Sequence, residues 1–281
     1  MKNFFIIANG YTDKDFTVAN DLDRYIKEKG AVSHVCKPKS SPDCSVDIAS
    51  EDVPLECECI LVLGGDGTLI RTSGALASLN IPFVGVNLGH LGYLCELDTN
   101  KVYEAIDRIL IDDFFIEERM MLHGKSNACQ NMRYAINDIV IGRKNSISMI
   151  ALKVSVNGEF LTTFECDGIV IATPTGSTGY SMSAGGPIVE PTADLLLLNP
   201  LNEHRLNSKC LVLDRHSDIE VQIIPRRQDG EEHASVICDG VEKGELKPDD
   251  KLVIRRAGTH VRILKFSNVT FLETLRRKME K

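Results

Sequence analysis

The sequence predicts an α/β N-terminal domain built on a mainly parallel sheet, followed by an all-β C-terminal domain. A chain of 281 residues favours two domains, or one large one, over a single small module. In the first part, short apolar runs alternate with helical patterns, which is typical of a parallel sheet that helices cover on both faces. Beyond about Glu118 the pattern changes to short strands separated by tight-turn dipeptides, which indicates a β domain.

The elements of the first part follow from apolar runs and helical spacing. Val18, Leu22, Tyr25 and Ile26 recur at helical intervals, and Gly30 is a suitable helix end. A polar stretch at 37–56, rich in Pro and Ser, is expected on the surface. The expected order is a strand at 4–8, a helix ending near Gly30, strands at 31–35 and 60–63, a helix at 68–79, a strand at 81–86 and a helix near 99–110.

The second part carries two hairpin signals. Asn157-Gly158 and Asp239-Gly240 each follow an apolar run, and both dipeptides accept the positive φ of a tight turn. The expected strands lie at 132–141, 149–156, 168–173, 219–224, 235–238, 252–256 and 261–266, and residues 271–281 form a basic helical tail.

Composition narrows the class of protein. The formal charge of −8 argues against bulk binding to nucleic acid or to an anionic membrane. No apolar run approaches the roughly 18 residues of a membrane helix. Nine cysteines without regular spacing, and an N-terminus without a signal-peptide pattern, indicate reduced thiols. We therefore expect a soluble, cytoplasmic protein with no membrane or nucleic-acid partner.

The strongest local motif is Gly64-Gly65-Asp66-Gly67-Thr68, which lies between a buried strand and a helix. Ligands of open α/β sheets bind at the carboxyl ends of the strands, and the amide end of a helix favours phosphate. A carboxylate beside a phosphate usually takes a proton from a hydroxyl or holds Mg²⁺. The alternative interpretation is a plain turn with a solvated Asp66.

A second Gly-rich stretch covers residues 173–187, in the β region. Such residues bury little and lose much backbone entropy on folding, so a bound ligand is a natural compensation. Their hydroxyls and amides can bond to sugars, bases and phosphates, and Tyr180 offers a ring for stacking. A long mobile loop is the alternative.

Together, these two motifs resemble the NAD kinase family, over nearly the whole chain. The first motif alone also resembles diacylglycerol and sphingosine kinases and phosphofructokinases, whereas the second narrows the resemblance to NAD kinase. The matching segments are residues 64–68 with Arg71, 87–94, 118–122, 137–138, and 167–168 running on through 173–189.

The resemblance implies domains at 1–117 and 118–266, a tail at 267–281 that packs on the first domain, and a dinucleotide bound between the domains. It also implies ATP and NAD as substrates, a divalent metal ion (Mg²⁺), and a homodimer or homotetramer. Polyphosphate as the donor and NADH as the acceptor stay open.

The resemblance assigns roles to individual residues. Asp66 would be the general base on the 2′-hydroxyl of the adenosine ribose, beside Gly67 and Arg71, while Asn137 and Asp138 would bind ribose hydroxyls or the pyrophosphate. The phosphate loop would comprise Gly64, Gly65, Gly67 and Thr68. The other expected dinucleotide contacts are Tyr93, Asp167, Thr178, Gly179, Tyr180, Ser181 and Ser183.

The sequence departs from the family pattern at several positions. Asp138 stands where Glu is commoner, Gly179 replaces the usual Ala, and Val241 follows Asp239-Gly240 where Gln is common. Asp167-Gly168 and Asp239-Gly240 are each open to interpretation as plain hairpin corners. A lipid kinase that shares the Gly-Gly-Asp-Gly motif and a non-catalytic dinucleotide-binding protein are the two alternative functions.

Overall fold

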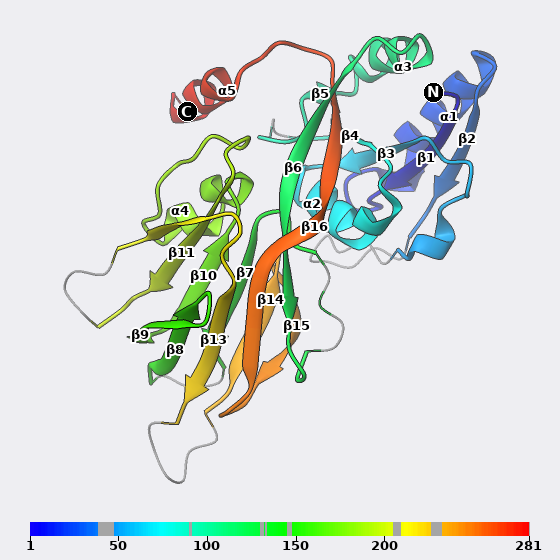
Figure 1. The fold of residues 1–281 in the computed structure, drawn as a ribbon. Helices are drawn as coiled ribbons and strands as arrows, with labels where there is room; N and C mark the ends of the chain where they lie inside the picture. The colour runs from blue at the N-terminus through cyan, green and yellow to red at the C-terminus, as the bar shows by residue number, and fades with distance from the viewer. Residues whose placement is uncertain are drawn as a thin grey trace. The chain divides into compact units, whose positions relative to one another are not determined.

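The computed structural model describes residues 1–38, 48–89, 92–129, 132, 134–144, 148–204, 209–225 and 232–280 (Figure 1). It separates into two compact units. Unit 1 comprises Met1–Glu118 and His260–Lys281, and unit 2 comprises Arg119–Thr259. The chain therefore returns to unit 1 after completing unit 2. Among the described residues, no helix has both the length and the apolar character that crossing a membrane requires.

Unit 1 is built on a parallel sheet with the strand order β2-β1-β3-β4. The strands are β1 (Asn3–Ala8), β2 (Val32–Cys36), β3 (Cys59–Gly64) and β4 (Phe83–Asn87), with the short β5 (Leu97–Asp98) paired to β4. All residues of β3 and β4 are buried, as expected for apolar runs covered on both faces. In this unit the end of β16 (Lys251–Lys265) adds a further parallel strand, because Ile263 aligns with Phe83.

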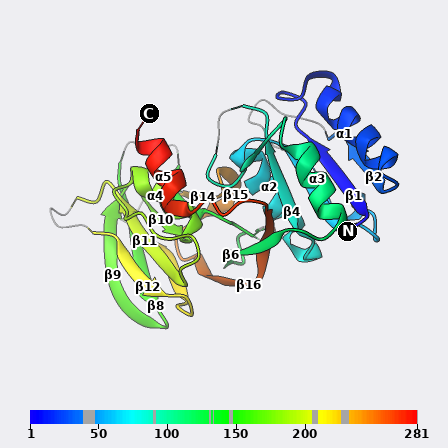
Figure 2. The same cartoon turned by 90° about the horizontal axis from the view of Figure 1, so that it is seen from above.

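Helices cover both faces of this sheet (Figure 2). The covering helices are α1 (Thr17–Glu28), α2 (Asp66–Leu76) and α3 (Val102–Leu110), whereas the C-terminal helix α5 (Phe271–Met279) has no buried residue. Leu22 of α1 and Ile106 of α3 join one apolar cluster with Val84 and Val86 of β4. Gly85 points to the opposite face, where its ideal Cβ would lie 3.0 Å from Leu69 of α2. This arrangement leaves the start of α2 at the carboxyl end of β3.

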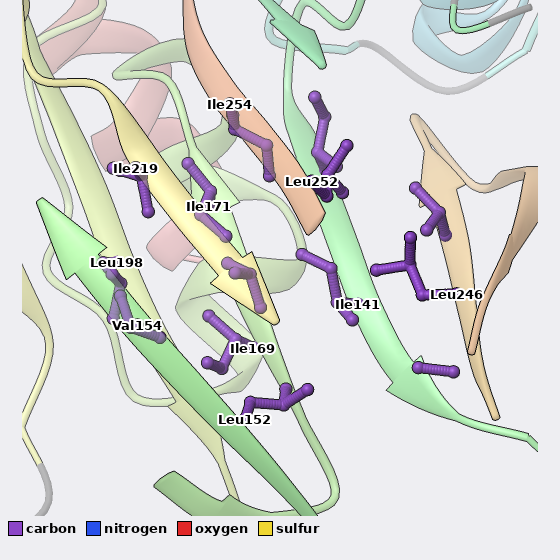
Figure 3. Packing of buried hydrophobic residues seen from close by; sticks show 14 of the residues in the cluster. Ile141, Leu152, Val154, Ile169, Ile171, Leu198, Ile219, Leu246, Leu252 and Ile254 are labelled. Atoms are coloured by element: carbon purple, nitrogen blue, oxygen red, sulfur yellow. The ribbon is translucent and has the colours of Figure 1, made fainter. Parts of the chain in front are cut away.

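Unit 2 consists of two antiparallel sheets whose apolar faces pack together. In one sheet the order is β16-β13-β8-β9, and in the other it is β12-β11-β10-β7-β14-β15. Figure 3 shows Leu152, Ile219 and Ile254 from the first sheet packed with Ile141 and Ile169 from the second. The strands are β6 (Phe115–Lys125), β7 (Asp138–Arg143), β8 (Ile150–Val156), β9 (Glu159–Cys166), β10 (Gly168–Ala172), β11 (Leu195–Leu201), β12 (Leu211–Asp214), β13 (Ile219–Ile224), β14 (Ala234–Cys238) and β15 (Val241–Leu246).

The predicted fold class is confirmed: an α/β unit with a mainly parallel sheet precedes an all-β unit, and the C-terminal segment returns to the first. Both hairpin signals are confirmed as well. Asn157 and Gly158 join β8 to β9 with φ of 54° and 81°. Asp239 and Gly240 join β14 to β15 with φ of 48° and 79°.

Several predicted element boundaries are wrong. The strands expected at 252–256 and 261–266 are one strand, β16, because it has a pairing partner near each end. The strand expected at 132–141 begins only at Asp138. Before it, Ala135 forms only an isolated bridge with Leu122 of β6, and the Ile136 and Asn137 amides donate to the Asp239 carboxylate. The Gly-rich stretch 173–187 is no open loop, because it contains the turn η4 (Thr175–Thr178) and the short helix α4 (Tyr180–Ser183).

Candidate active-site residues in the two units

The first motif forms a tight strand-to-helix turn in unit 1. β3 ends at Gly64, Gly65 caps α2 in an extended conformation, and Asp66 is the first residue of that helix. An ideal Cβ on Gly64 would lie 2.4 Å from the Thr68 hydroxyl, so only glycine fits there. Gly67 is exposed in the first turn. The turn thus presents the amide end of an eleven-residue helix at the carboxyl edge of the sheet.

The Asp66 carboxylate is anchored by the main chain that follows β4. Its Oδ2 accepts a hydrogen bond from the Tyr93 amide (2.5 Å), and its Oδ1 accepts from the amides of Leu94 (3.2 Å) and Cys95 (2.9 Å). An ideal Cβ on Gly92 would lie 1.9 Å from Oδ1, so a side chain at position 92 would displace the carboxylate. Residues 87–94 belong to the family resemblance, but the sequence does not indicate that their main chain binds Asp66.

This anchoring determines what Asp66 can do. An ionised carboxylate has about four lone-pair positions, and three amides use three of them. The Cys95 thiol, a weak donor, also hydrogen-bonds to this carboxylate, so a substrate hydroxyl would have to take the remaining acceptor position in place of the thiol. The half-buried side chain is held in a fixed direction, which general-base catalysis needs.

Two other predicted residues lie near this turn. Arg71 is on α2, five positions after Asp66, and is half-buried. The ring of Tyr93 lies under the Lys278 ammonium of α5, 4.4 Å from nitrogen to ring centroid. Burial and then the negative charge of Asp66 raise the pKa of Tyr93. His90 and Leu91, which belong to the same motif, lie outside the described residues.

In unit 2 the predicted residues Asn137 and Asp138 stand at the entrance of β7. The Asp239 carboxylate accepts hydrogen bonds from the amides of Ile136 (2.8 Å), Asn137 (2.9 Å) and Asp138 (3.1 Å). Asp138 is buried, with 5% of its surface exposed. Burial, and then the charge of Asp239, raise the pKa of Asp138 to about 7. Burial also raises the pKa of Asp239, to about 6, against the three amide bonds that lower it.

The second motif packs directly against this strand entrance. The Thr173 hydroxyl donates to the Ile136 carbonyl (2.6 Å), and the Thr173 amide donates to the Asn137 carbonyl (2.8 Å). An ideal Cβ on Gly176 would lie 2.2 Å from that same Asn137 oxygen, so position 176 requires glycine. At Gly179, an ideal Cβ would lie 3.7 Å from Asn137 Nδ2 and 3.8 Å from Asp138 Oδ2. The structure therefore brings Gly179 together with Asn137 and Asp138.

The other residues of the second motif differ in exposure. Tyr180 is 49% exposed and Ser183 is exposed, so both side chains are accessible. Thr178 is half-buried, and its hydroxyl donates to the Thr175 carbonyl. Ser181 is fully buried, and its carbonyl accepts from Asn199 Nδ2 (3.0 Å). Ser181 is therefore part of the packed interior of unit 2, and its side chain is not exposed at the surface.

Asp167 has a different set of partners from Asn137 and Asp138. Its Oδ1 pairs with Arg143 Nε (3.2 Å), and its Oδ2 accepts from Asn202 Nδ2 (2.9 Å). The Asp167-Gly168 dipeptide is not a hairpin corner, because β9 pairs with β8 whereas β10 pairs with β7 and β11. Asp167 instead marks the crossing from one sheet of unit 2 to the other.

Sequence reasoning missed the role of Asp239. It appeared to be only a hairpin corner, and the structure shows that it is both a corner and the acceptor for three amides. The signal was weak, because a contact about a hundred residues away in the sequence leaves no local pattern.

A divalent metal ion would need several ligating side chains placed close together. Within the described ranges, no group of three or more His, Cys, Asp or Glu side chains is placed to hold an ion. Asp66 has most of its acceptor positions occupied by amides. The described residues therefore do not form an all-protein metal site.

Sequence comparisons identify the family. The models of the ATP-NAD kinase N-terminal and C-terminal domains match residues 4–114 and 136–266. A NAD kinase of Agathobacter rectalis is 47% identical over 279 residues, covering 99% of both chains. A NAD kinase of Lachnoclostridium phytofermentans is 34% identical over 284 residues, also covering 99% of both.

Structural comparisons show the same fold in solved proteins. Yeast NADH kinase, crystallised with NADH, superposes with a TM-score of 0.83 at 23% identity, covering 100% of this chain and 87% of that one. A NAD kinase from Archaeoglobus fulgidus, crystallised with ATP, gives 0.77 at 23% identity, covering 99% and 98%. Given two matching domain models in the right order and full-length relatives at up to 47% identity, the chain belongs to the ATP-NAD kinase family.

Proposed function

We propose that this enzyme transfers the γ-phosphoryl group of ATP to the 2′-hydroxyl of the adenosine ribose of NAD, producing NADP and ADP. The observation that carries the proposal is Asp66, which three amides hold in a fixed direction at the start of α2. The relatives that cover 99% of the chain are NAD kinases, so a lipid kinase is not favoured.

The proposed reaction divides between the two units. In unit 1, Asp66 accepts the proton of the 2′-hydroxyl as the new O–P bond forms and the bond from the γ-phosphorus to the departing ADP oxygen breaks. The amides at Gly65 to Gly67 and the Arg71 guanidinium supply positive charge to the phosphates. In unit 2, Asn137, Asp138 and the neighbouring 178–183 segment hold the dinucleotide. Positioning provides most of the rate in such a reaction.

A divalent ion is part of the proposal. Mg²⁺ in phosphoryl-transfer sites is usually bound by one or two carboxylates together with substrate phosphates. Because the described residues form no metal cluster, we propose that Mg²⁺ arrives bound to ATP.

We also propose a cellular location and an oligomeric state. All eight cysteines in the described part are free thiols, which supports a cytoplasmic location. We propose a homodimer or homotetramer, and the exposed Phe160 and Leu161 on β9, at the edge of its sheet, support an association between copies. With a charge of −8, no nucleic-acid partner is proposed.

The site of phosphorylation tests the proposed function directly. We expect the 2′-phosphate of the adenosine ribose to be the sole product, because misplacement by about 1 Å can cost on the order of a hundredfold in rate. NAD that lacks this 2′-hydroxyl should bind without being phosphorylated. Phosphorus NMR of the product, after incubation with Mg-ATP and NAD, distinguishes the isomers. A substantial 3′-phosphate or nicotinamide-ribose phosphate signal would contradict both the proposed positioning and the role of Asp66.

Replacing the buried carboxylate of unit 2 tests the dinucleotide contact. Asp138→Ala should weaken NAD binding roughly ten- to a hundredfold, because a carboxylate that accepts from ribose hydroxyls contributes about 1.5 to 3 kcal/mol. Titration calorimetry with NAD at pH 8 measures this. Unchanged NAD affinity would show that Asp138 does not contact the dinucleotide.

A further inference from the structure

The strand entrance that carries Asn137 and Asp138 has an unusual set of partners. Its three residues, 136–138, have three amides and three carbonyls. All three amides donate to the Asp239 carboxylate. The carbonyls of Ile136 and Asn137 accept from the hydroxyl and the amide of Thr173, and the Asp138 carbonyl accepts from the Asp239 amide (3.1 Å). Thus two residues, Asp239 and Thr173, satisfy every backbone polar group of this segment.

The sheet explains how Asp239 reaches this position. β14 pairs antiparallel with β7 up to Cys238 opposite Ile139, so the next residue of β14 lies beside the start of β7. There the chain makes its tight turn, with Asp239 at φ 48° and Gly240 at φ 79°. Asp tolerates the left-handed region, so one residue both makes the turn and points its carboxylate at the three amides. An Asn or a Gly would make the turn equally well, so the turn does not explain the carboxylate.

We propose that Asp239 is a positioning residue for the dinucleotide, fixing the main chain of 136–138 so that the Asn137 and Asp138 side chains are already set when the substrate arrives. This inference rests on the proposed function, which assigns the ribose contact to those two side chains. Rigid support of this kind raises affinity, because less ordering is required on binding.

The charge of Asp239 acts on the same residues. Three amide bonds favour its ionised form, and this negative charge opposes ionisation of the buried Asp138. The other ionisable groups that act on this pair or on its neighbour Cys238 are Lys243 and Cys129. Removing the charge at position 239 should therefore let Asp138 ionise at a lower pH, an effect that a purely structural turn residue would not have.

The conservative variant Asp239→Asn tests the proposal in the full-length enzyme. Its amide group keeps the turn and up to two of the amide bonds, but presents a donor where the Ile136 amide needs an acceptor. We expect the KM for NAD to rise roughly tenfold while the KM for ATP and kcat stay within about twofold. The pH at which NAD affinity is half-maximal should also move downward.

The second hairpin provides a matched control. Asn157 occupies an equivalent turn at φ 54°, followed by Gly158, in the sheet that does not contain Asp239, and its Oδ1 accepts from the Asp218 amide (2.8 Å) beside it. Asn157→Ala and Asp239→Ala therefore make the same change at the same kind of turn, and only the second should raise the KM for NAD. If Asp239→Asn leaves both the KM and the pH midpoint unchanged, or if Asn157→Ala raises the KM equally, the proposal is wrong. Failure of the proposed function would instead appear in the parent enzyme, as an absence of NADP.

Discussion

Asp66→Asn is expected to lower turnover by at least about a hundredfold, since a general base contributes roughly 10² to 10⁴-fold to such a reaction. Asn keeps the shape of the side chain and loses its basicity. The NH₂ group of Asn also replaces one of the two carboxylate oxygens. It then faces either the Tyr93 amide or the amides of Leu94 and Cys95, so a donor stands where those amides need an acceptor. Steady-state kcat with Mg-ATP and NAD measures the first effect, and the thermal midpoint measures the second.

Asp13→Asn is the matched control for this experiment. The Asp13 carboxylate is buried and accepts from the amides of Val18 (3.0 Å) and Ala19 (3.0 Å) at the start of α1. Its replacement should cost comparable stability with turnover close to that of the parent. Gly92→Ala provides the converse test, because its Cβ would displace the Asp66 carboxylate without removing it. If Asp66→Asn turns over within a few-fold of the parent, Asp66 is not the base.

The fold could be predicted from local patterns, whereas the long-range contacts of Asp66 and Asp239 could not. Apolar runs and turn dipeptides are local signals, so the alternating part and both hairpins were evident in the sequence. The bonds from Asp66 to residues 93–95 and from Asp239 to residues 136–138 join distant parts of the chain. A residue that is chosen for such a contact looks, in the sequence, like an ordinary helix start or turn.

A distant contact also accounts for the Gly-rich stretch 173–187, for which a long mobile loop was the alternative interpretation. Its small residues suggested a loop, because small polar residues bury little by themselves. In the structure, Gly176 is there because the backbone of Asn137 passes too close for a side chain. Arg119 is buried beside it and donates to the Thr175 hydroxyl (3.3 Å). Gly176 is therefore required by close packing against Asn137, and not by a need for backbone flexibility.

Asp138→Asn is expected to stabilise the protein, and increasingly so as the pH rises from about 4 to about 8. The unfolded carboxyl has a pKa of about 3.9, whereas burial and Asp239 raise the pKa of Asp138 to about 7 in the folded state. Between these two values the folded state binds the proton more tightly, so the parent loses stability as the pH rises through this window. A difference of three pKa units corresponds to about 4 kcal/mol in the free energy of unfolding, which the parent loses across this window. The Asn side chain does not titrate, so Asp138→Asn does not lose this stability.

Urea unfolding of the parent and of Asp138→Asn at pH 5 and pH 8 measures this difference. A stability gap that is the same at both pH values would show that Asp138 is not held near neutrality by its surroundings. A buried carboxylate that costs stability at neutral pH is characteristic of functional sites. Ribose hydroxyls that donate to Asp138 would favour its ionised form, so NAD should stabilise the parent more strongly at pH 8 than at pH 5, and the Asn variant should lose that dependence.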